Sequence, residues 1–409
     1  RDKDHLLPVN PAEDPKIFSL VLDSGLDTSP GSVFQEEMRR IFPSLRTEWA
    51  NARISQEQIV RIQRHADGAD MIVCSTFARL SSGVNISSIP KEQEKIIHGL
   101  MDTGKPFLWI AFGNPYILED FPGIGTYLCT FSYSDGSQRA AAKALSGAIP
   151  VTGKMPVSIP KFVSVGDGLQ FPKLEMRLRP SPEDVANTSI DALDTIRNNL
   201  IKYNNSCMHP DNSRFESCDY AQLVVGHKNS IVFNIRTGDD ESSGVPLWPD
   251  SIGFNAIMSA MLAVESGRLL LEAPIADYLP EYRDTDLASR PICSLLEEMH
   301  ENNPVALADK VQNAELIGEI VSRAWGLPNG RILDRQLFEP LGCAPLAETR
   351  PEDPSRYSGY ATPDFAPVAQ LLLNKGMYDH RRIFKPGTIQ RFTASAGGRK
   401  ALGWMKPDR

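Results

Sequence analysis

The chain has 409 residues, of which 41% are hydrophobic and 23% charged, which is the composition of a folded globular protein. Its formal net charge is −8 and it has no dense run of Lys and Arg, which argues against the concentrated basic surface that nucleic-acid binding requires. No apolar run approaches the ~18 residues of a membrane-spanning helix, and the length predicts two domains.

The sequence begins at Arg1 with neither Met nor a signal-peptide pattern, so we expect the natural amino terminus to lie upstream. Six cysteines are scattered along the chain: Cys74, Cys129, Cys207, Cys218, Cys293 and Cys343. Cys74 and Cys129 stand in apolar, strand-like runs, which predicts buried thiols rather than a disulfide framework. This slightly favours a reducing compartment such as the cytoplasm.

In the first 175 residues, short apolar runs alternate with amphipathic stretches of helical period. The runs are Ile17 to Leu22, Met71 to Thr76, Pro106 to Phe112 and Tyr127 to Tyr133. The helical stretches are Val33 to Ile41, Ser55 to His65, Glu92 to Met101 and Ser137 to Leu145. Continuous apolar strands are buried on both faces, so the pattern predicts an α/β domain with a parallel sheet covered by helices on each side.

Ligands of such sheets usually bind in the loops that follow the carboxyl ends of the strands. These loops are Asp23-Ser24-Gly25, Phe77-Ala78-Arg79 and Gly113-Asn114-Pro115, and none carries a phosphate-binding fingerprint. Gly123-Ile124-Gly125 lacks the third glycine and the following helix of a dinucleotide-binding loop. We therefore predict a turn there and no cofactor.

Three segments carry a family resemblance: Thr103-Gly104-Lys105-Pro106, Gly113-Asn114-Pro115-Tyr116 and Gly153-Lys154-Met155-Pro156-Val157-Ser158-Ile159-Pro160. Together with the opening Asp4-His5-Leu6-Leu7-Pro8, they resemble the second domain of family 3 glycoside hydrolases, in the β-N-acetylglucosaminidase branch. The resemblance covers roughly residues 1 to 175 and implies a flavodoxin-like domain that follows a (β/α)8 barrel. In that family the barrel holds the aspartate nucleophile and, in this branch, a His/Asp pair as acid/base. The resemblance thus implies that the chemistry lies in a part absent from this sequence.

Retaining glycoside hydrolysis needs two groups about 5 Å apart across the scissile bond. The candidate carboxylates of the first half are Glu119, Asp120 and Asp135, all at expected helix starts and loops. Acidic residues there commonly cap or stabilise the first helical turn. We therefore expect that residues 1 to 178 cannot cleave sugars alone.

Residues Lys161 to Asn187 contain Pro172, Pro180 and Pro182, which predicts an extended linker and domains at 1–178 and 179–409. A helical period follows from Ile190 to Ile201. A polar stretch then contains Cys207, His209 and Cys218, with His227 further on. Their spacing differs from that of zinc fingers and knuckles, so we predict no metal site. A Cys207–Cys218 disulfide is the alternative if the protein is exported.

The second half begins with an expected β-hairpin, in which Ala221 to Val225 and Ser230 to Ile235 are joined by a turn. A long apolar helix is expected from about Gly253 to Ser266. This order of elements resembles the serine β-lactamase and penicillin-binding protein family, in which a hairpin leads to the helix that carries the nucleophile. Two later segments, Gly318 through Cys343 and Gly359 through Gly376, add to the resemblance. It implies an α+β, β-lactamase-like domain over residues 179 to 409.

That family uses a serine at the helix start and a lysine one turn later. Its spacing puts Asp250 and Gly253 at these two positions, and a shift by one residue puts Ser251 and Phe254 there. Neither register has a lysine. Ser251 is therefore only a weak catalytic candidate, and the sequence favours it as the N-cap of the helix.

The family's other two active-site elements are a Tyr-x-Asn-like motif and a Lys- or His-Thr-Gly strand. The first falls at Val311-Gln312-Asn313, before the expected Gly318 helix, or by strict spacing at Asp309, and neither has a phenol. The second would follow Trp404, and the sequence ends at Arg409. We therefore expect a catalytically degenerate domain.

These inferences favour the accessory carboxy-terminal region of a family 3 β-N-acetylglucosaminidase-type hydrolase, with this chain itself inactive. The parent protein would release terminal N-acetylglucosamine from cell-wall or chitin fragments. Two alternatives stay open: a serine hydrolase of the β-lactamase or esterase class using Ser251, and a sugar-binding, peptidoglycan-binding or dimerisation module. The expected partners are the upstream barrel, a saccharide containing N-acetylglucosamine and, as an open alternative, a second copy of the chain.

Overall fold

The computed structural model describes residues 1–23, 30–51, 53–78, 89–177, 179–180, 221–227, 230–237, 249–299, 307–343 and 365–393, with a few single positions between 194 and 202. The chain forms two compact units. The first comprises Arg1–Glu175 with His380–Arg382, and the second comprises Met176–Asp379 with Ile383–Arg409.

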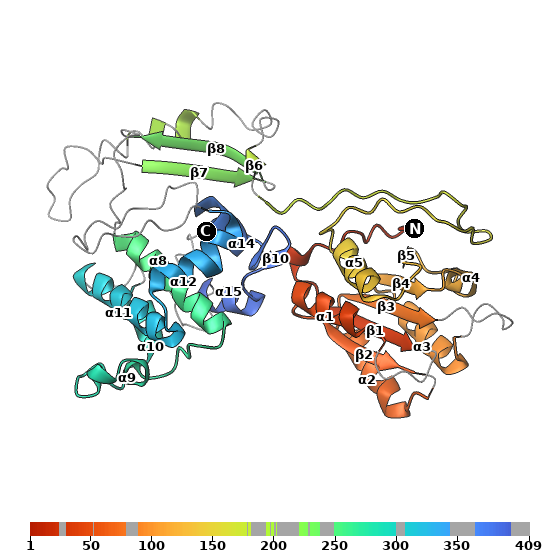
Figure 1. Cartoon of the computed structure of the whole chain (residues 1–409), viewed down its shortest axis with the longest axis horizontal. Helices are drawn as coiled ribbons and strands as arrows, with labels where there is room; N and C mark the ends of the chain where they lie inside the picture. The colour runs from red at the N-terminus through yellow and green to blue at the C-terminus, as the bar shows by residue number, and fades with distance from the viewer. Residues whose placement is uncertain are drawn as a thin grey trace. The chain divides into compact units, whose positions relative to one another are not determined.

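The first unit is built on a five-stranded, fully parallel sheet (Figure 1). Its strands are β1 (Ile17–Asp23), β2 (Arg46–Ala50), β3 (Met71–Ala78), β4 (Phe107–Gly113) and β5 (Thr126–Cys129). The order β2-β1-β3-β4-β5 is that of flavodoxin-like, doubly wound sheets. The predicted α/β class is therefore confirmed, with two local differences: β2 was not predicted, and β5 ends four residues before Tyr133.

Helices cover both faces of this sheet (Figure 1). They are α1 (Ser32–Ile41), α2 (Gln56–Asp67), α3 (Lys91–Met101), the short α4 (Ile117–Asp120) and α5 (Asp135–Leu145), with a 3-10 turn at Pro11–Glu13. Two buried clusters separate the faces. One joins the sheet to α2 and α3, and the other joins it to α1 and α5.

The alternation of side chains along β1 explains how one apolar run serves both faces. Phe18, Leu20 and Leu22 belong to the cluster under α2 and α3, and Ile17 belongs to the cluster under α1 and α5. All four are buried. A strand buried on both sides has no polar face, which is why the run was recognisable in the sequence.

The linker predicted from Lys161 onward begins later than expected. Residues after 161 still bond to the first unit: the Met155 amide donates to the Asp167 carbonyl at 2.7 Å, and Val151 pairs with Phe171 as an isolated bridge. The Leu174 amide donates to the Gly147 carbonyl at 2.8 Å. The stretch from Lys161 to Leu174 therefore packs on the first unit. Of the predicted helix from Ile190 to Ile201, the structure describes residues 194–196 and 198–199, which are helical.

The second unit contains a three-stranded sheet of order β6-β8-β7. Its strands are β6 (Arg179–Pro180), β7 (Ala221–His227) and β8 (Ser230–Thr237). β7 and β8 are antiparallel, with a register shift between Val225 and Gly226. The predicted hairpin is therefore confirmed.

The rest of the second unit is mainly helical (Figure 1). Its elements are α8 (Pro249–Glu265), α9 (Ile275–Tyr278), a 3-10 turn (Pro280–Tyr282), α10 (Ile292–Glu298), α11 (Leu307–Trp325), α12 (Asn329–Leu333), a π-helical turn (Asp334–Phe338), α13 (Glu339–Leu341), α14 (Phe365–Leu373), β9 (Met377–Tyr378), β10 (Arg381–Arg382) and α15 (Pro386–Thr393). α8 is the central helix, because Met258, Met261 and Ala263 on different sides of it are all fully buried. A helix that is apolar all round is a core helix. The combination of a small sheet and packed helices gives the expected α+β class.

Candidate functional site

Of the three loops expected to bind a ligand at the carboxyl edge of the parallel sheet, the structure describes one. Residues 24–29 and 79–88, which follow β1 and β3, lie outside the described residues. After β4, Gly113 has a φ of 98°, and the buried Asn114 accepts a hydrogen bond from the Tyr116 amide at 3.0 Å. The Tyr127 hydroxyl donates to the Pro115 carbonyl at 2.9 Å. These contacts make the loop a tight structural turn.

The three candidate carboxylates lie where the sequence placed them, at helix starts. Glu119 and Asp120 are exposed in the four-residue helix α4. Asp135 is the exposed first residue of α5, and the preceding Ser134 is the cap, whose hydroxyl accepts from the Ser137 amide. Glu119 and Asp120 are neighbours in α4 and Asp135 begins α5, so all three occupy positions where acidic residues commonly stabilise the first helical turn.

The predicted turn at Gly123-Ile124-Gly125 is confirmed. The Ile124 amide donates to the Phe121 carbonyl at 3.1 Å, and the segment leads directly into β5 rather than into a helix. A Cβ atom on Gly125 would stand 1.8 Å from Asp4 Oδ2, so glycine allows the chain start to pack there. This close approach is a structural reason for glycine at position 125.

The helix expected to carry a nucleophile is α8, and it starts earlier than predicted. It begins at Pro249, so Ser251 and Asp250 lie in its first turn and Ser251 is not the residue before the helix. The N-cap interpretation of Ser251 was wrong because Pro249, with its fixed φ, already suits the first helical position. The side chains of Asp250 and Ser251 lie outside the described ones.

One turn after these residues, the two possible lysine positions are occupied by Gly253 and Phe254. A Cβ on Gly253 would lie 3.5 Å from Met299 Cε, and Phe254 packs against the core of the unit. The residues of α8 include neither Lys nor Arg. A serine hydroxyl needs an adjacent base to attack a carbonyl, and this helix has no lysine for that role.

The segment matched to the tyrosine motif is part of a helix, whereas we expected it before the Gly318 helix. α11 begins at Leu307, so it includes both Asp309 and Asn313. Asn313 is buried, and its amide donates to Glu298 Oε2 at 3.0 Å. Arg290 forms an ion pair with the other oxygen of Glu298.

The hydrogen bond from Arg290 is the main reason that the pKa of Glu298 is lowered, and the bond from Asn313 adds to the effect. A carboxylate held in this way stays ionised and is a weak general base at neutral pH. The three side chains therefore join α10 to α11 and do not rebuild a catalytic site.

The cysteines of the first unit are thiols of low reactivity. Cys74 is free and buried in β3, as predicted, and burial raises its pKa well above the usual range. Cys129 in β5 is half-buried, and burial raises its pKa to about 11. Cys207, His209 and Cys218 lie outside the described residues, as does the side chain of His227. Among the described side chains, no group of three potential metal ligands comes together.

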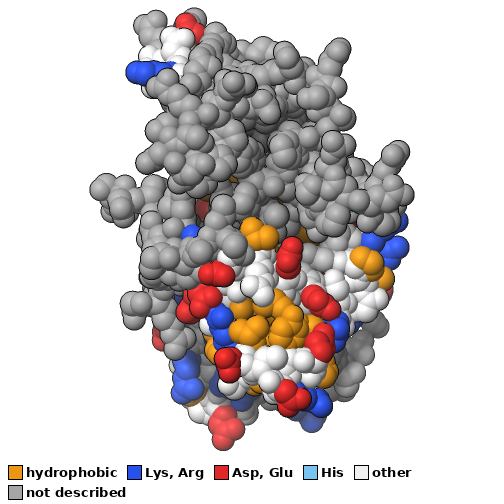
Figure 2. Space-filling view, turned by 90° about the vertical axis from the view of Figure 1, so that its left-hand side faces the viewer, with side chains coloured by type: hydrophobic (Ala, Val, Ile, Leu, Met, Phe, Trp, Pro, Cys, Tyr) orange, Lys and Arg blue, Asp and Glu red, His pale blue; other side chains and the backbone are white. Residues whose placement is uncertain are grey.

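The described face of the second unit shown in Figure 2 carries a small apolar patch bordered by Asp, Glu, Lys and Arg side chains. An apolar patch can contact a partner, but it supplies no acid, base or nucleophile. None of the described helices is long and apolar enough to cross a membrane.

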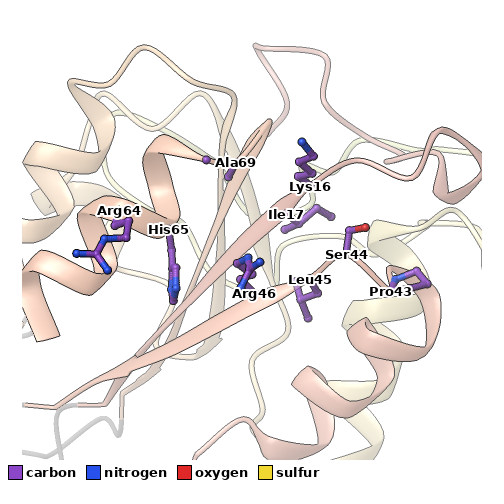
Figure 3. A pocket seen from close by; sticks show the side chains of 10 residues that line it. Lys16, Ile17, Pro43, Ser44, Leu45, Arg46, Arg64, His65 and Ala69 are labelled. Atoms are coloured by element: carbon purple, nitrogen blue, oxygen red, sulfur yellow. The ribbon is translucent and has the colours of Figure 1, made fainter. Parts of the chain in front are cut away.

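A pocket of about 650 Å³ lies at the opposite, amino-terminal edge of the parallel sheet (Figure 3). Its lining comes from the starts of β1 and β2 and from the end of α2: Lys16, Ile17, Pro43, Ser44, Leu45, Arg46, Arg64, His65, Gly68 and Ala69. Figure 3 shows Arg46 between His65 on one side and Leu45 and Ser44 on the other. The lining contains basic side chains and no carboxylate.

Sequence reasoning missed this pocket. Its basic residues are far apart in the sequence, and Arg46 begins β2, the strand that was not predicted. The usable signal was the placement of Lys16 directly before β1 and of Arg64 in the last turn of α2, since both elements were predicted.

No family model and no curated protein matches the chain in sequence. Among solved structures, the chain is similar to part of a fungal multi-domain family 3 β-N-acetylglucosaminidase, with 21% identity over 41% of this chain and 18% of that one, at a TM-score of 0.34. A family 3 β-N-acetylglucosaminidase from Paenibacillus is 13% identical over 32% of this chain and 25% of that one, at a TM-score of 0.27. A penicillin-binding protein homolog from Caulobacter crescentus is 16% identical over 50% of this chain and 76% of that one, at a TM-score of 0.36. The chain spans a quarter or less of the two glycosidases, so the activity of a whole enzyme is a matter for proposal.

Proposed function

We propose that this chain is the accessory, non-catalytic carboxy-terminal region of a larger family 3 glycoside hydrolase of the β-N-acetylglucosaminidase type. The proposal rests on the structural role of the three segments that resemble this family, which begin at Thr103, Gly113 and Gly153. In the first unit they make turns and core contacts, and they present no pair of catalytic groups among the described residues.

Three contacts illustrate that role. Lys105 Nζ donates to the carbonyls of Asp67 and Ala69 at 2.6 and 2.5 Å, which ties the start of β4 to the end of α2. The Gly113-Asn114-Pro115 turn closes on the hydroxyl of Tyr127. Ile159, in the closing segment, is 1% exposed and belongs to the core under α2 and α3.

The second unit supports the same proposal through its central helix. α8 has no lysine to activate Ser251, and its remaining residues are used for core packing. A domain can keep a hydrolase fold after the groups that stabilise the transition state are lost, since binding and catalysis are separable. The parent enzyme's catalytic aspartate and His/Asp pair would then lie in a (β/α)8 barrel outside this chain.

The test compares this chain with the longer protein encoded by its gene. Both are assayed with 4-nitrophenyl N-acetyl-β-D-glucosaminide at equal molar concentration. We expect release of nitrophenol by the longer protein only, and loss of that release when the barrel's nucleophilic aspartate is replaced by asparagine. Hydrolysis by residues 1–409 alone, or upstream sequence that encodes no barrel, would contradict the proposal.

A further inference from the structure

The pocket at the amino-terminal edge of the sheet is a separate feature, which the proposed function does not use. Its volume of about 650 Å³ lies within the 300–1,000 Å³ that small-molecule sites usually occupy. Ile17, Pro43, Leu45 and Ala69 form apolar parts of the lining, and the polar parts come mostly from Lys16, Arg46, Arg64 and His65.

The positions of these side chains follow from the strand register. Arg46 is paired with Phe18 in the parallel ladder, so the two residues lie on the same face of the sheet. His65 lies on this face as well, because its ring centroid is 5.9 Å from that of Phe18. Lys16 is two residues before Phe18, a spacing that puts two strand residues on one face, and it also lines the pocket.

Three carboxylates beside this lining already accept from protein groups, and one of them is Asp14, whose Oδ2 accepts from the hydroxyl of the lining residue Ser44 at 3.5 Å. Glu48 Oε1 lies 3.3 Å from Arg61 Nε and 3.5 Å from His65 Nδ1. Asp70 Oδ2 accepts the Lys16 backbone amide at 2.8 Å. Among the described residues, no carboxylate forms an ion pair with the side chains of Lys16, Arg46 or Arg64, whereas Arg40 and Arg139 of the same unit are paired with glutamates.

One of these cations has a structural explanation. Arg64 lies in the last turn of α2, where a positive charge offsets the partial negative charge of the helix end. In Figure 3 its guanidinium points away from Arg46. Lys16 and Arg46 come from strand starts, so no helix end accounts for them. Lys16 and Arg46 thus line a concave surface without a described carboxylate partner, which favours the binding of a small anion. The net charge of −8 disfavours the binding of a large polyanion.

We propose that this pocket binds a small anion carrying phosphate groups, with Lys16 and Arg46 as its principal contacts. Arg46 presents a planar fork of donors suited to two phosphate oxygens, and Lys16 acts as a point charge. The volume exceeds that of a single phosphate group, so the ligand carries more than one phosphate group or a phosphate with an uncharged body. Ser44 also lines the pocket, but its hydroxyl donates to Asp14 Oδ2 at 3.5 Å, so we assign it no contact with the ligand.

The test is isothermal titration calorimetry of the full chain with inorganic pyrophosphate at low ionic strength. We expect binding that weakens as sodium chloride is added, because the contacts are charged and exposed. Arg46→Gln and Lys16→Gln should each weaken binding about tenfold or more, the loss expected for one charge-assisted hydrogen bond. Arg40→Gln is the matched control, because Arg40 is an exposed arginine of the same unit that pairs with Glu36 and Glu37, and it should leave binding unchanged.

Lys16 and Arg46 are both exposed, so the variants should fold like the wild type, which circular dichroism will check. The absence of heat with millimolar pyrophosphate would overturn the proposal. Binding that survives both substitutions, or that is lost equally in Arg40→Gln, would also overturn it. Since sugar hydrolysis is not measured, this result is independent of the proposed glycosidase role.

Discussion

Gly376 offers a sharp test of the packing of the second unit. It follows α14 with a φ of 89°, in the left-handed region that alanine adopts only with strain. Its amide donates to the Leu371 carbonyl at 2.8 Å, and its carbonyl accepts from the Ile383 amide at 2.9 Å. A Cβ atom at Gly376 would stand 2.1 Å from the backbone oxygen of Phe384, which no side-chain rotation can relieve.

Gly326 is a matched control, because it follows α11 with a φ of 68° and a Cβ atom there would meet none of the described neighbouring atoms within 4 Å. Gly326→Ala should therefore lower the free energy of unfolding only by the cost of placing alanine in the left-handed conformation, about 1–2 kcal/mol. Gly376→Ala adds a steric term of about 1–3 kcal/mol, the range for overpacked sites. The total for Gly376→Ala is then about 2–5 kcal/mol.

Hydrogen exchange followed by mass spectrometry measures both variants in the full chain and resolves each unit separately. Peptides from α8 and α14 should lose about 5- to 150-fold more protection in Gly376→Ala than in Gly326→Ala, since the steric term of about 1–3 kcal/mol converts at about 1.4 kcal/mol per factor of ten. Peptides from the parallel sheet of the first unit should be unchanged. Equal losses in the two variants would refute the close approach of Gly376 to Phe384.

Three further predictions concern single side chains. Because Arg290 lowers the pKa of Glu298, the ionised carboxylate should stabilise the fold at pH values above the usual pKa of 4.5, and this stabilisation should be lost as the pH falls through the lowered pKa. The urea midpoints of the wild type and Glu298→Gln should therefore differ at neutral pH and converge in acid. Trp109→Phe should destabilise the first unit by about 1–3 kcal/mol in urea unfolding, because the buried indole donates to Thr76 Oγ1 at 3.1 Å. Iodoacetamide should alkylate Cys74 rapidly in urea and very slowly in the native protein, as mass spectrometry will show, because burial both shields the thiol and raises its pKa.

The elements that could be predicted from the sequence are those whose burial is uniform. β4 is apolar up to its final glycine and β1 is apolar except for Ser19 and Asp23, and their limits were found to within one or two residues. β2 is an edge strand that begins with three polar residues, Arg46, Thr47 and Glu48, so it gives no continuous apolar signal. Its absence from the prediction also hid the basic pocket, because Arg46 had no place in the fold.

The helix starts of the second unit were predicted less well, for a different reason. The family resemblance suggested a loop motif before Gly318, yet Leu307, Val311 and Ala314 continue the apolar period of α11 backwards by three turns. At α8, the Ser251 cap was inferred from residue type, while Pro249 was the stronger start signal. In both places local periodicity and proline chemistry were more informative than the family pattern.

The proposal that this chain is non-catalytic is tested most directly by covalent labelling. The full chain is incubated with a fluorophosphonate and, separately, with a fluorescent penicillin, and its intact mass is then measured. Because α8 provides no lysine to activate a serine, we predict an unchanged mass with both reagents. A mass increase that maps to Ser251 and disappears in Ser251→Ala would contradict the account.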